Sequence, residues 1–377
     1  MGVPQPHRLF VPCAPGLEPW LLAEIRAVGG VRPRAVGGGV ELEANDHVLA
    51  RTLLEVGLGL DVRARLGAFP AHYFDAIARG TAALPWGRFV GPGQTVEIRA
   101  AARRSKLLHT GAIEERVLEG IKKVVGSLAT DDPDPWRVYA RLERDQLSLS
   151  ISLAGEPLHR RGYRLQTGKA PLREDLARGL LAVAGWSPDE AFVDLFCGSG
   201  TLAIEAARWA CARPPGWDRG FHWTRAPTFD AERWAKVRKG LESRIRSSAP
   251  KEIRASDRDA GAVAAARANA ERAGVGGAIS FSESALGAAE LSGMAGPGLW
   301  LSNPPFGTRV RGGGLRSLYQ SIGHRFRELP VGWRLGLLVD DPKLAHGTGL
   351  DLKSRVLLDH GGKKVRLYTT GEDDDAG

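Results

Sequence analysis

The residues best suited to chemistry are Asn303, Pro304, Pro305 and Phe306, which follow the apolar run "WLS". Consecutive prolines fix their own φ and donate no backbone hydrogen bond, so they predict a rigid turn at the end of a strand. There the side-chain oxygen of Asn303 and the backbone oxygen of Pro304 can accept the two hydrogens of a nucleobase amine, while Phe306 stacks on the base. Because Asn has no useful basicity, we expect catalysis by orientation and electrostatics, on a base that has left its stack.

A glycine-rich turn after a second strand could hold a small ligand. In "DLFCGSGT", Asp194 lies in the strand, and Gly198, Ser199 and Gly200 form the turn into the next helix. Glycines let a ligand approach the backbone closely and tolerate positive φ. The third glycine of a dinucleotide fingerprint would have to be Ala203, and no Gly-Lys-Ser/Thr follows as in a P-loop. Alone, the loop is weak evidence for a cofactor site.

A carboxylate ends a third strand, in "IRASDRDAG". Asp257 can accept hydrogen bonds from both hydroxyls of a ribose, or it can cap the next helix, a role that Asp259 fills better. It follows the glycine loop by about 60 residues, more than the roughly 20 of a compact dinucleotide unit. In a doubly wound sheet such strand ends meet where ligands bind, so the three segments together favour one site.

Alternating helices and strands must position these segments. Beyond Pro171 the order of helix, strand, helix and strand predicts an α/β fold with a doubly wound parallel sheet. Before it, the pattern predicts small α+β units. Apolar residues at helical spacing from 113 to 125 predict a helix, and alternation on both sides of Arg144–Asp145 predicts a hairpin.

Composition favours a soluble cytoplasmic protein with a polyanionic partner. The 377 residues carry a formal charge of +9 and only three cysteines, with no CxxC pair. Neither a disulfide framework nor a zinc site is expected. No apolar stretch is long enough to span a membrane, and no signal sequence is evident. Positive charge of this kind favours nucleic acid as the partner, although it can also simply confer solubility.

Two basic clusters are candidates for contacts with phosphate or a nucleic-acid backbone. Arg103, Arg104 and Lys106 precede a predicted helix, where a solvated helix entrance is the alternative. The segment "EPLHRRGYRLQTGKAPL" surrounds an aromatic residue, Tyr163, with arginines. Such a linker suits a nucleic-acid backbone with one stacked base, but it is equally consistent with a plain soluble linker.

Nearly the whole chain resembles the THUMP-domain guanine-N2 RNA methyltransferases, which are class I S-adenosylmethionine-dependent enzymes. The resemblance rests on "APGLEPWLLAE", "LHRRGYR", "APLREDLA", "FCGSGTLAIEAA", "SDRDAGAVAAARANAERAG" and "LSNPPFGTR", in that family's order, the last containing its (N/D)PP(Y/F) signature. The insertion "RPPGWDRGFHW" is more similar to the branch that acts on large-subunit ribosomal RNA than to the tRNA branch.

The resemblance implies a domain order and a Rossmann-like catalytic domain. The expected parts are a ferredoxin-like α+β unit (1–65), a THUMP RNA-binding domain (66–155), a basic linker (156–170), a methyltransferase domain (171–371) and an acidic tail (372–377).

The resemblance also implies the site residues. The glycine turn would approach the methionine part of the cofactor, Asp257 would hold the ribose, and the guanine amine would meet Asn303, Pro304, Pro305 and Phe306. The residues expected around S-adenosylmethionine are Asp194, Phe196, Cys197, Gly198, Ser199, Gly200, Thr201, Asp257, Arg258, Ser284 and Asn303. Those expected at RNA are Arg103, Arg104, Lys106, Arg160, Arg161, Arg164 and Arg309. No metal is expected.

Two departures from the family pattern matter. Phe306 stands where Tyr is more common, so stacking survives but a hydroxyl contact is lost. The acidic residue that often binds the cofactor's adenine amine is absent, because Ser284 is followed by Ala285. Adenine would then be held by Ser284 or a backbone carbonyl. Glu205 is either a partner of the cofactor amine or a charge on a helix face.

Other readings stay open. The same corner fits an adenine N6 amine, and the RNA could be tRNA. An NAD(P)-dependent oxidoreductase could use the same sheet but would have no role for Asn303. A non-catalytic RNA-binding assembly factor is a further alternative.

Overall fold

The computed structural model describes residues 6–165, 172–294, 296–306 and 314–371. Their packing divides the chain into two compact units. The first comprises Met1–Cys13, Leu21–Leu158 and Arg219–Lys239, and the second Ala14–Trp20, His159–Asp218 and Gly240–Gly377.

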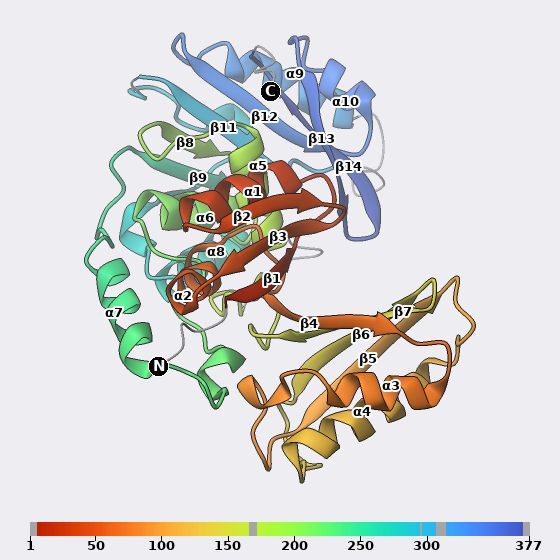
Figure 1. Cartoon of the computed structure of the whole chain (residues 1–377). Coiled ribbons are helices and arrows are strands. Elements are labelled where there is room, and N and C mark those ends of the chain that lie inside the picture. The colour runs from red at the N-terminus through yellow and green to blue at the C-terminus, as the bar shows by residue number, and fades with distance from the viewer. Residues whose placement is uncertain (1–5, 166–171, 295, 307–313, 372–377) are drawn as a thin grey trace. The chain divides into compact units, whose positions relative to one another are not determined.

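The first unit is built on a seven-stranded sheet with the order β2-β3-β1-β4-β7-β6-β5 (Figure 1). All neighbouring strands are antiparallel except β5 and β6. Its strands are β1 (His7–Pro12), β2 (Val31–Val36), β3 (Gly39–Ala44), β4 (Arg63–Pro70), β5 (Val96–Arg103), β6 (Trp136–Glu143) and β7 (Gln146–Ser152). Its helices are α1 (Glu18–Ala27), which begins in the second unit, α2 (Asp46–Glu55), α3 (Phe74–Ala82), η1 (Trp86–Arg88) and α4 (Thr110–Val125).

Two sequence-based expectations for this unit are confirmed. The helix α4 buries Ile113, Val117, Ile121 and Val125 on one face, as its apolar spacing predicts. The strands β6 and β7 form the expected hairpin, and Arg144 and Asp145 both adopt positive φ (51° and 59°). Positive φ at both central residues is the geometry of a tight turn whose twist matches that of the strands.

A segment from the second half of the sequence packs within the first unit. It includes η2 (His222–Arg225) and most of α7 (Ala231–Glu242). The Nε2 atom of His222 lies 2.7 Å from the Asp134 carboxylate, and Trp223, which is 2% exposed, makes an edge contact with the His7 ring. The range 171–371 stays our prediction for the methyltransferase domain, but residues 219–239 within it pack with the first unit.

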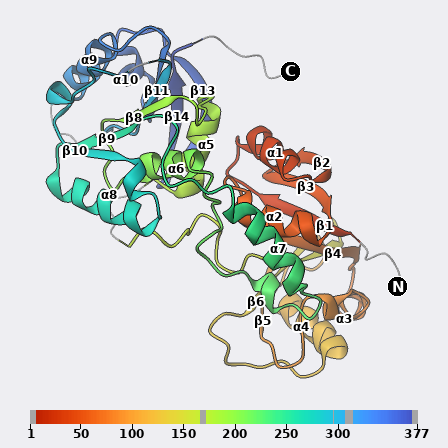
Figure 2. The same ribbon diagram turned by 90° about the vertical axis from the view of Figure 1, so that its left-hand side faces the viewer.

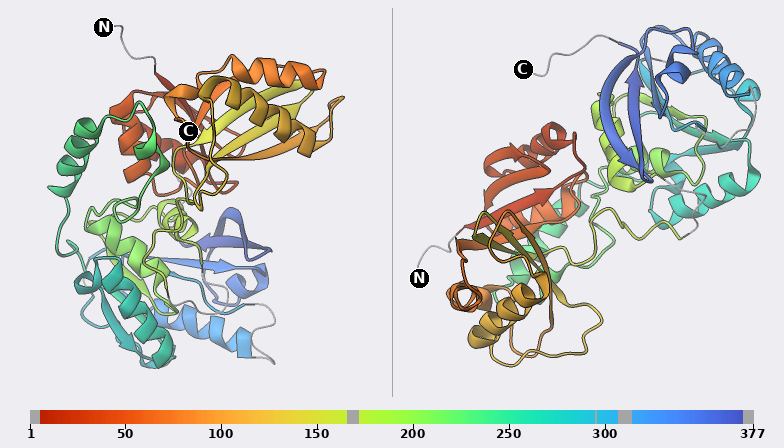
Figure 3. Two further views of the ribbon diagram at one scale, coloured as in Figure 1. Left: turned by 90° about the horizontal axis from the view of Figure 1, so that it is seen from below. Right: turned by 90° about the vertical axis from the view of Figure 1, so that its right-hand side faces the viewer.

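The second unit contains the expected doubly wound sheet, in the order β10-β9-β8-β11-β12-β14-β13. The first five strands are parallel, and β14 inserts antiparallel between β12 and β13. In Figure 3 the long blue strands of residues 353–369 form this antiparallel pair. The strands are β8 (Ala191–Asp194), β9 (Ile253–Asp257), β10 (Ser280–Glu283), β11 (Gly298–Ser302), β12 (Trp333–Val339), β13 (Lys353–His360) and β14 (Lys363–Thr369).

Helices cover both faces of this sheet (Figure 2). Tyr319, Ile322 and Ala345, from α9 and α10, share a buried apolar cluster with Val193 and Leu335 of the strands. On the other face α6 packs against α5 and α8. The helices are α5 (Glu174–Val183), α6 (Thr201–Ala210), α8 (Ala260–Arg272), η3 (Gly276–Ala278), η4 (Leu286–Ala288), α9 (Gly314–Phe326) and α10 (Pro342–His346).

Within the described residues, no helix is both long and apolar enough to cross a membrane. Within the described residues the three cysteines are buried and form no disulfide bond. Among the same residues, no cluster of three His, Cys, Asp or Glu side chains could hold a metal ion.

Candidate active site

Three adjacent strands of the second sheet carry the predicted site residues at their carboxyl ends. Strands β9, β8 and β11 are parallel neighbours, ending at Asp257, Asp194 and Ser302. A cavity of about 1240 Å³ opens at this edge of the sheet. Every residue expected around the cofactor lines this cavity except Gly200. Residues 303–306 form a turn that we call the proline corner, and Asn303 and Pro305 of this turn line the cavity.

Asp194 is the most deeply buried charged residue of this cavity. It is 1% exposed, and its Oδ1 accepts hydrogen bonds from Ser302 Oγ (2.7 Å) and the Phe196 backbone amide (3.1 Å). Burial raises the pKa of the Asp194 carboxyl to about 7, because ionising it away from water is unfavourable. A cation bound beside it would favour the carboxylate.

Asp257 ties the glycine loop to the next strand end. Its Oδ2 accepts a hydrogen bond from the Gly198 amide (2.9 Å), and its Oδ1 accepts one from the Asp259 amide (3.1 Å). Asp259, not Asp257, caps α8, since its side chain accepts from the amides of Gly261 and Ala262. Asp257 is therefore left to line the cavity.

The two glycines of the loop have different reasons to be glycine. Gly198 has φ +51°, and a Cβ built on it would meet nothing within 4 Å. Gly200 has φ +87°, and its Cβ would lie 2.9 Å from that of Ala266 in α8. Gly198 thus leaves backbone accessible to a ligand, whereas Gly200 permits close helix packing.

The proline corner presents an unused acceptor. The Oδ1 atom of Asn303 is buried and has no hydrogen-bond partner among the described residues. A buried polar atom is normally hydrogen-bonded, so this one fits a site that receives a donor from a ligand. Pro304 does not line the cavity. Phe306 is 2% exposed and does not line it either, so the structure does not present the ring for the stacking we expected.

One face of α9 contributes cavity residues that sequence reasoning missed. Ser317, Gln320, Ser321 and His324 follow helical spacing, and all four line the cavity, as do Ser284 and Ala285 across from them. A polar stripe at this spacing, directly after the proline corner, was the available signal.

Two side chains of the predicted basic linker, Arg161 and Tyr163, are buried. Arg161 and Glu205 are both 1% exposed and form an ion pair at 3.2 Å, and the Tyr163 hydroxyl donates to Glu205 (3.0 Å). A buried arginine cannot contact RNA, so the RNA contact expected of Arg161 was wrong. The burial of Tyr163 likewise disfavours the alternative in which this residue stacks on a base. Glu205 is neither a cofactor partner nor a helix-face charge, because the buried linker side chains occupy its carboxylate.

The other predicted RNA residues differ in their surroundings. Arg164 is also engaged, pairing with Glu174 while 11% exposed. Arg160, Arg103, Arg104 and Lys106 are exposed, and Arg103 pairs with Glu143 at 2.7 Å. Arg309 lies outside the described residues. The exposed members stay predictions.

The sheet order and the cavity formed by a glycine loop, a strand-end aspartate and an Asn-Pro-Pro-Phe corner define a Rossmann-like methyltransferase fold. Residues 161–355, more than half of the chain, match the family described as "RMKL-like, methyltransferase domain", and the chain belongs to that family. Residues 8–56 match the RlmL ferredoxin-like domain, and residues 71–152 match the THUMP domain. The expected fold class and family are confirmed.

Named relatives agree with this assignment. The chain is 33% identical to the ribosomal RNA large subunit methyltransferase K/L of Cellvibrio japonicus, over 91% of this chain and 48% of that protein. It spans about half the length of the curated relatives it matches.

Solved structures match almost the whole chain. The putative methyltransferase SMU.472, complexed with SAH, is 26% identical with a TM-score of 0.88, over 98% of this chain and 99% of that one. A predicted N6-adenine-specific DNA methylase of Listeria monocytogenes is 26% identical with a TM-score of 0.86, over 98% and 97%.

Proposed function

We propose that this chain transfers a methyl group from S-adenosylmethionine to the exocyclic N2 of a guanine in RNA, with large-subunit ribosomal RNA as the substrate. The observation that carries the proposal is the buried, unused Oδ1 of Asn303 at the rim of a large cavity. The names of the curated relatives support the substrate class. We propose that the partner is ribosomal RNA and that the protein acts in the cytoplasm.

The residues of the cavity fit the cofactor. Asp257 and the open backbone at Gly198 suit the ribose and the methionine part, and Ser284 with the polar stripe of α9 suits the adenine. The ionised form of Asp194 suits a cation. When bound, S-adenosylmethionine would supply an electrophilic methyl group carried on a positively charged sulfur.

Asn303 would act by orienting the guanine amine. Its Oδ1 would accept one of the two amine hydrogens. The nitrogen lone pair would then point out of the base plane toward the methyl donor. The cavity volume of about 1240 Å³ exceeds the roughly 300–1000 Å³ of typical single-ligand pockets, so it has room for a nucleobase beside the cofactor.

Asn303→Ala tests this proposal. We expect methyl transfer to fall by at least about 100-fold, the range for losing one oriented hydrogen-bonding group in an active site, with cofactor affinity little changed. Transfer of radioactive methyl to ribosomal RNA and calorimetric titration of the cofactor measure the two quantities. Asn45→Ala is the matched control, since it removes the same amide from the N-cap of α2 in the other unit. A normally active Asn303→Ala enzyme would contradict the orienting role.

An adenine-N6 activity is the second candidate, because the same corner accepts either exocyclic amine. The similarity to the Listeria monocytogenes protein, which is described as a predicted N6-adenine-specific DNA methylase, favours it. Mass spectrometry of nucleosides from methylated RNA and DNA distinguishes N2-methylguanosine from N6-methyladenosine.

A further inference from the structure

Ser302 is the last residue of β11 and directly precedes Asn303. It is 0% exposed and does not line the cavity, so a ligand there would not touch it. The ladder between β11 and β8 runs as far as Trp300 and Val193, and beyond that pair the Ser302 side chain makes the contact with β8. Ser302 therefore joins the strand end at Asp194 to the strand end that leads into Asn303.

The hydroxyl of Ser302 has its full hydrogen-bonding capacity in use. Its oxygen lies 3.0 Å from Trp300 Nε1, 3.2 Å from the Leu195 amide nitrogen and 2.7 Å from Asp194 Oδ1. An indole N–H and an amide N–H can only donate, so the hydroxyl accepts from both of them. Its single proton is then left for Asp194 Oδ1. The chemistry of the partners therefore fixes the direction of this hydrogen bond.

This hydrogen bond decides which oxygen of Asp194 can meet a ligand. Oδ1 accepts from Ser302 and from the Phe196 amide, while the Asp194 residue lines the cavity. Oδ2 is therefore the oxygen that can face a ligand or carry a proton. A hydroxyl that donates to a carboxyl group favours its ionised form, and a cationic ligand binds that form best.

We propose that Ser302 is a positioning residue for the cofactor: its hydroxyl proton holds the Asp194 carboxylate in the orientation and the charge state that S-adenosylmethionine requires. Because Ser302 and Asn303 are consecutive, one residue would support the cofactor while the next orients the base. The inference rests on the cofactor site of the proposed function, but not on guanine or RNA as the substrate.

The other ionisable groups around Asp194 do not take over this role. Asp257, at the end of β9, is a like charge that disfavours the Asp194 carboxylate. Burial raises the pKa of the Cys197 thiol, which keeps it neutral. The remaining ionisable residues of the cavity lining are Arg258, Asp259, His324, Arg325 and Glu328. All of them are unchanged when Ser302 is substituted, so an altered pH dependence would come from its hydroxyl.

Ser302→Ala tests the role through the pH dependence of cofactor affinity. Calorimetric titration of the full chain with S-adenosylmethionine, without RNA, gives this affinity between about pH 6 and 9. The pKa of Asp194 is about 7, so the wild-type affinity should fall below that pH. Removing a hydrogen bond to the carboxylate should raise this pKa by a further unit or so, roughly. The affinity of the variant should then be about tenfold below that of wild type at pH 6 and approach it at pH 9.

The matched control is Ser256→Ala, on the neighbouring strand β9. Ser256 directly precedes Asp257, is 3% exposed, and its Oγ has no hydrogen-bond partner among the described residues. The control removes the same hydroxyl from an adjacent strand end and should leave the pH dependence unchanged. In an Asp194→Asn background, Ser302→Ala should have no pH-dependent effect, because the group that titrates is gone.

Ser302→Ala also deprives the N–H groups of Trp300 and Leu195 of this acceptor, so it should lower stability. Loss of stability alone would not move the pH at which the affinity falls. Should the alanine variant not fold, Ser302→Cys replaces it, since a thiol is a weak donor and should shift the profile in the same direction by less. A profile like that of wild type would overturn the proposal, as would an equal shift in Ser256→Ala. If wild type still methylated RNA, either result would leave the proposed function standing, and a chain inactive toward RNA can still pass this test.

Discussion

Ionisation of Asp194 should make the free energy of unfolding and the affinity for the cofactor depend on pH. The two quantities should change in opposite directions as the pH rises. The carboxyl is buried and lines the cavity, and its pKa is raised to about 7. Asp194→Asn is a close isostere, because both hydrogen bonds to the residue are accepted by Oδ1, which an asparagine keeps. The variant therefore removes the charge while leaving these contacts in place.

The magnitude follows from the shift in pKa. The pKa of Asp194 rises from 3.8 to about 7, a shift of roughly three units, which corresponds to a change of about 4 kcal/mol in the free energy of unfolding. Since the folded state holds this proton more tightly than the unfolded state, the contribution to stability is complete below about pH 4 and is lost as pH rises to about 7. At pH 8 the asparagine variant should therefore have the higher free energy of unfolding, by up to about 4 kcal/mol, with no such gain near pH 4.

Cofactor binding should show the reverse trend. A cationic ligand favours ionised Asp194, so below pH 7 binding must displace a proton and the affinity falls by up to about tenfold per pH unit. At pH 8 the Asp194→Asn variant should bind the cofactor more weakly than wild type does. Its cofactor affinity should not show this dependence on pH.

Denaturant unfolding followed by tryptophan fluorescence, and calorimetric titration with S-adenosylmethionine, measure the two trends between pH 4 and 8 in wild type and variant. If wild type and Asp194→Asn have parallel pH profiles in both assays, the buried carboxyl does not titrate as described and the electrostatic argument fails.

Two further substitutions test the scaffold of the site. Gly200→Ala should destabilise the second unit by more than about 1–2 kcal/mol, because a steric clash with Ala266 is added to the strain of positive φ. Gly198→Ala should lose only the free energy of the strain, since its added Cβ meets no other atom. Thermal unfolding of the two variants compares these losses. Glu205→Ala should cost about 3–5 kcal/mol, because it removes the carboxylate that pairs with the buried Arg161. Glu205→Leu combined with Arg161→Met should recover much of that loss in the same assay.

The parts of the site that sequence reasoning predicted are those with a local signal. A glycine turn, a strand-end carboxylate and a double proline each reflect backbone geometry at their own position, so their meeting at one edge follows from the parallel sheet. The polar stripe of α9 has a signal too, but its meaning depends on which face of the helix meets the cavity. That is decided by apolar residues such as Tyr319 and Ile322, which anchor the opposite face.

The expectation for Arg161 was wrong for a different reason. The charge density of a segment does not indicate whether a buried carboxylate elsewhere in the fold pairs with its arginines. The partner of Tyr163 and Arg161 is Glu205, about forty residues away on α6. Burial of an arginine is favourable only when such a partner is present, and the pairing is visible only in three dimensions.

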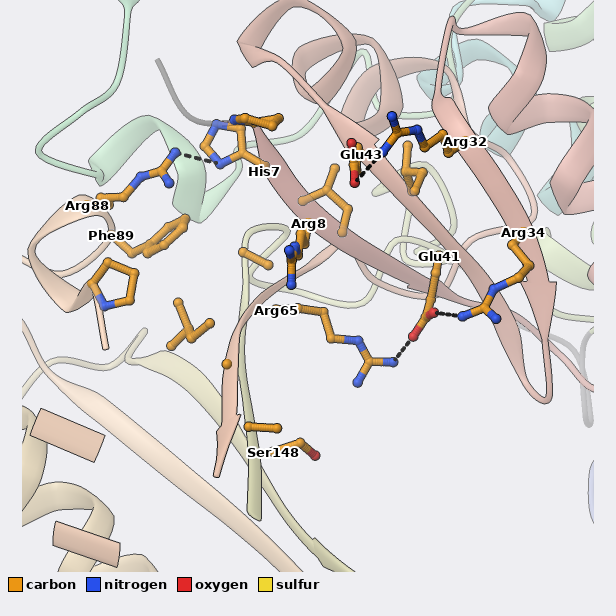
Figure 4. Close-up of a pocket in the computed structure, with 18 residues that line it drawn as sticks. His7, Arg8, Arg32, Arg34, Glu41, Glu43, Arg65, Arg88, Phe89 and Ser148 are labelled. Carbon is orange, nitrogen blue, oxygen red and sulfur yellow. Dashed lines mark hydrogen bonds and ion pairs between the residues drawn. The ribbon is translucent and has the colours of Figure 1, made fainter. Parts of the chain in front are cut away.

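The two pockets have opposite charge, and this matters for a chain proposed to bind both a cation and a polyanion. The cavity of the second unit is lined by four carboxyl groups and two arginines, whereas a pocket of the first unit is lined by five arginines and two glutamates (Figure 4). A formal charge of +9 would by itself repel a cationic cofactor. Because salt screens exposed charges over about 8 Å, the local lining rather than the net charge decides what each pocket attracts. Raising salt should therefore weaken RNA binding strongly while leaving cofactor affinity nearly constant, because Asp194, which we propose lies beside the cofactor, is buried and poorly screened. A cofactor affinity that fell as steeply with salt as RNA binding would contradict this separation.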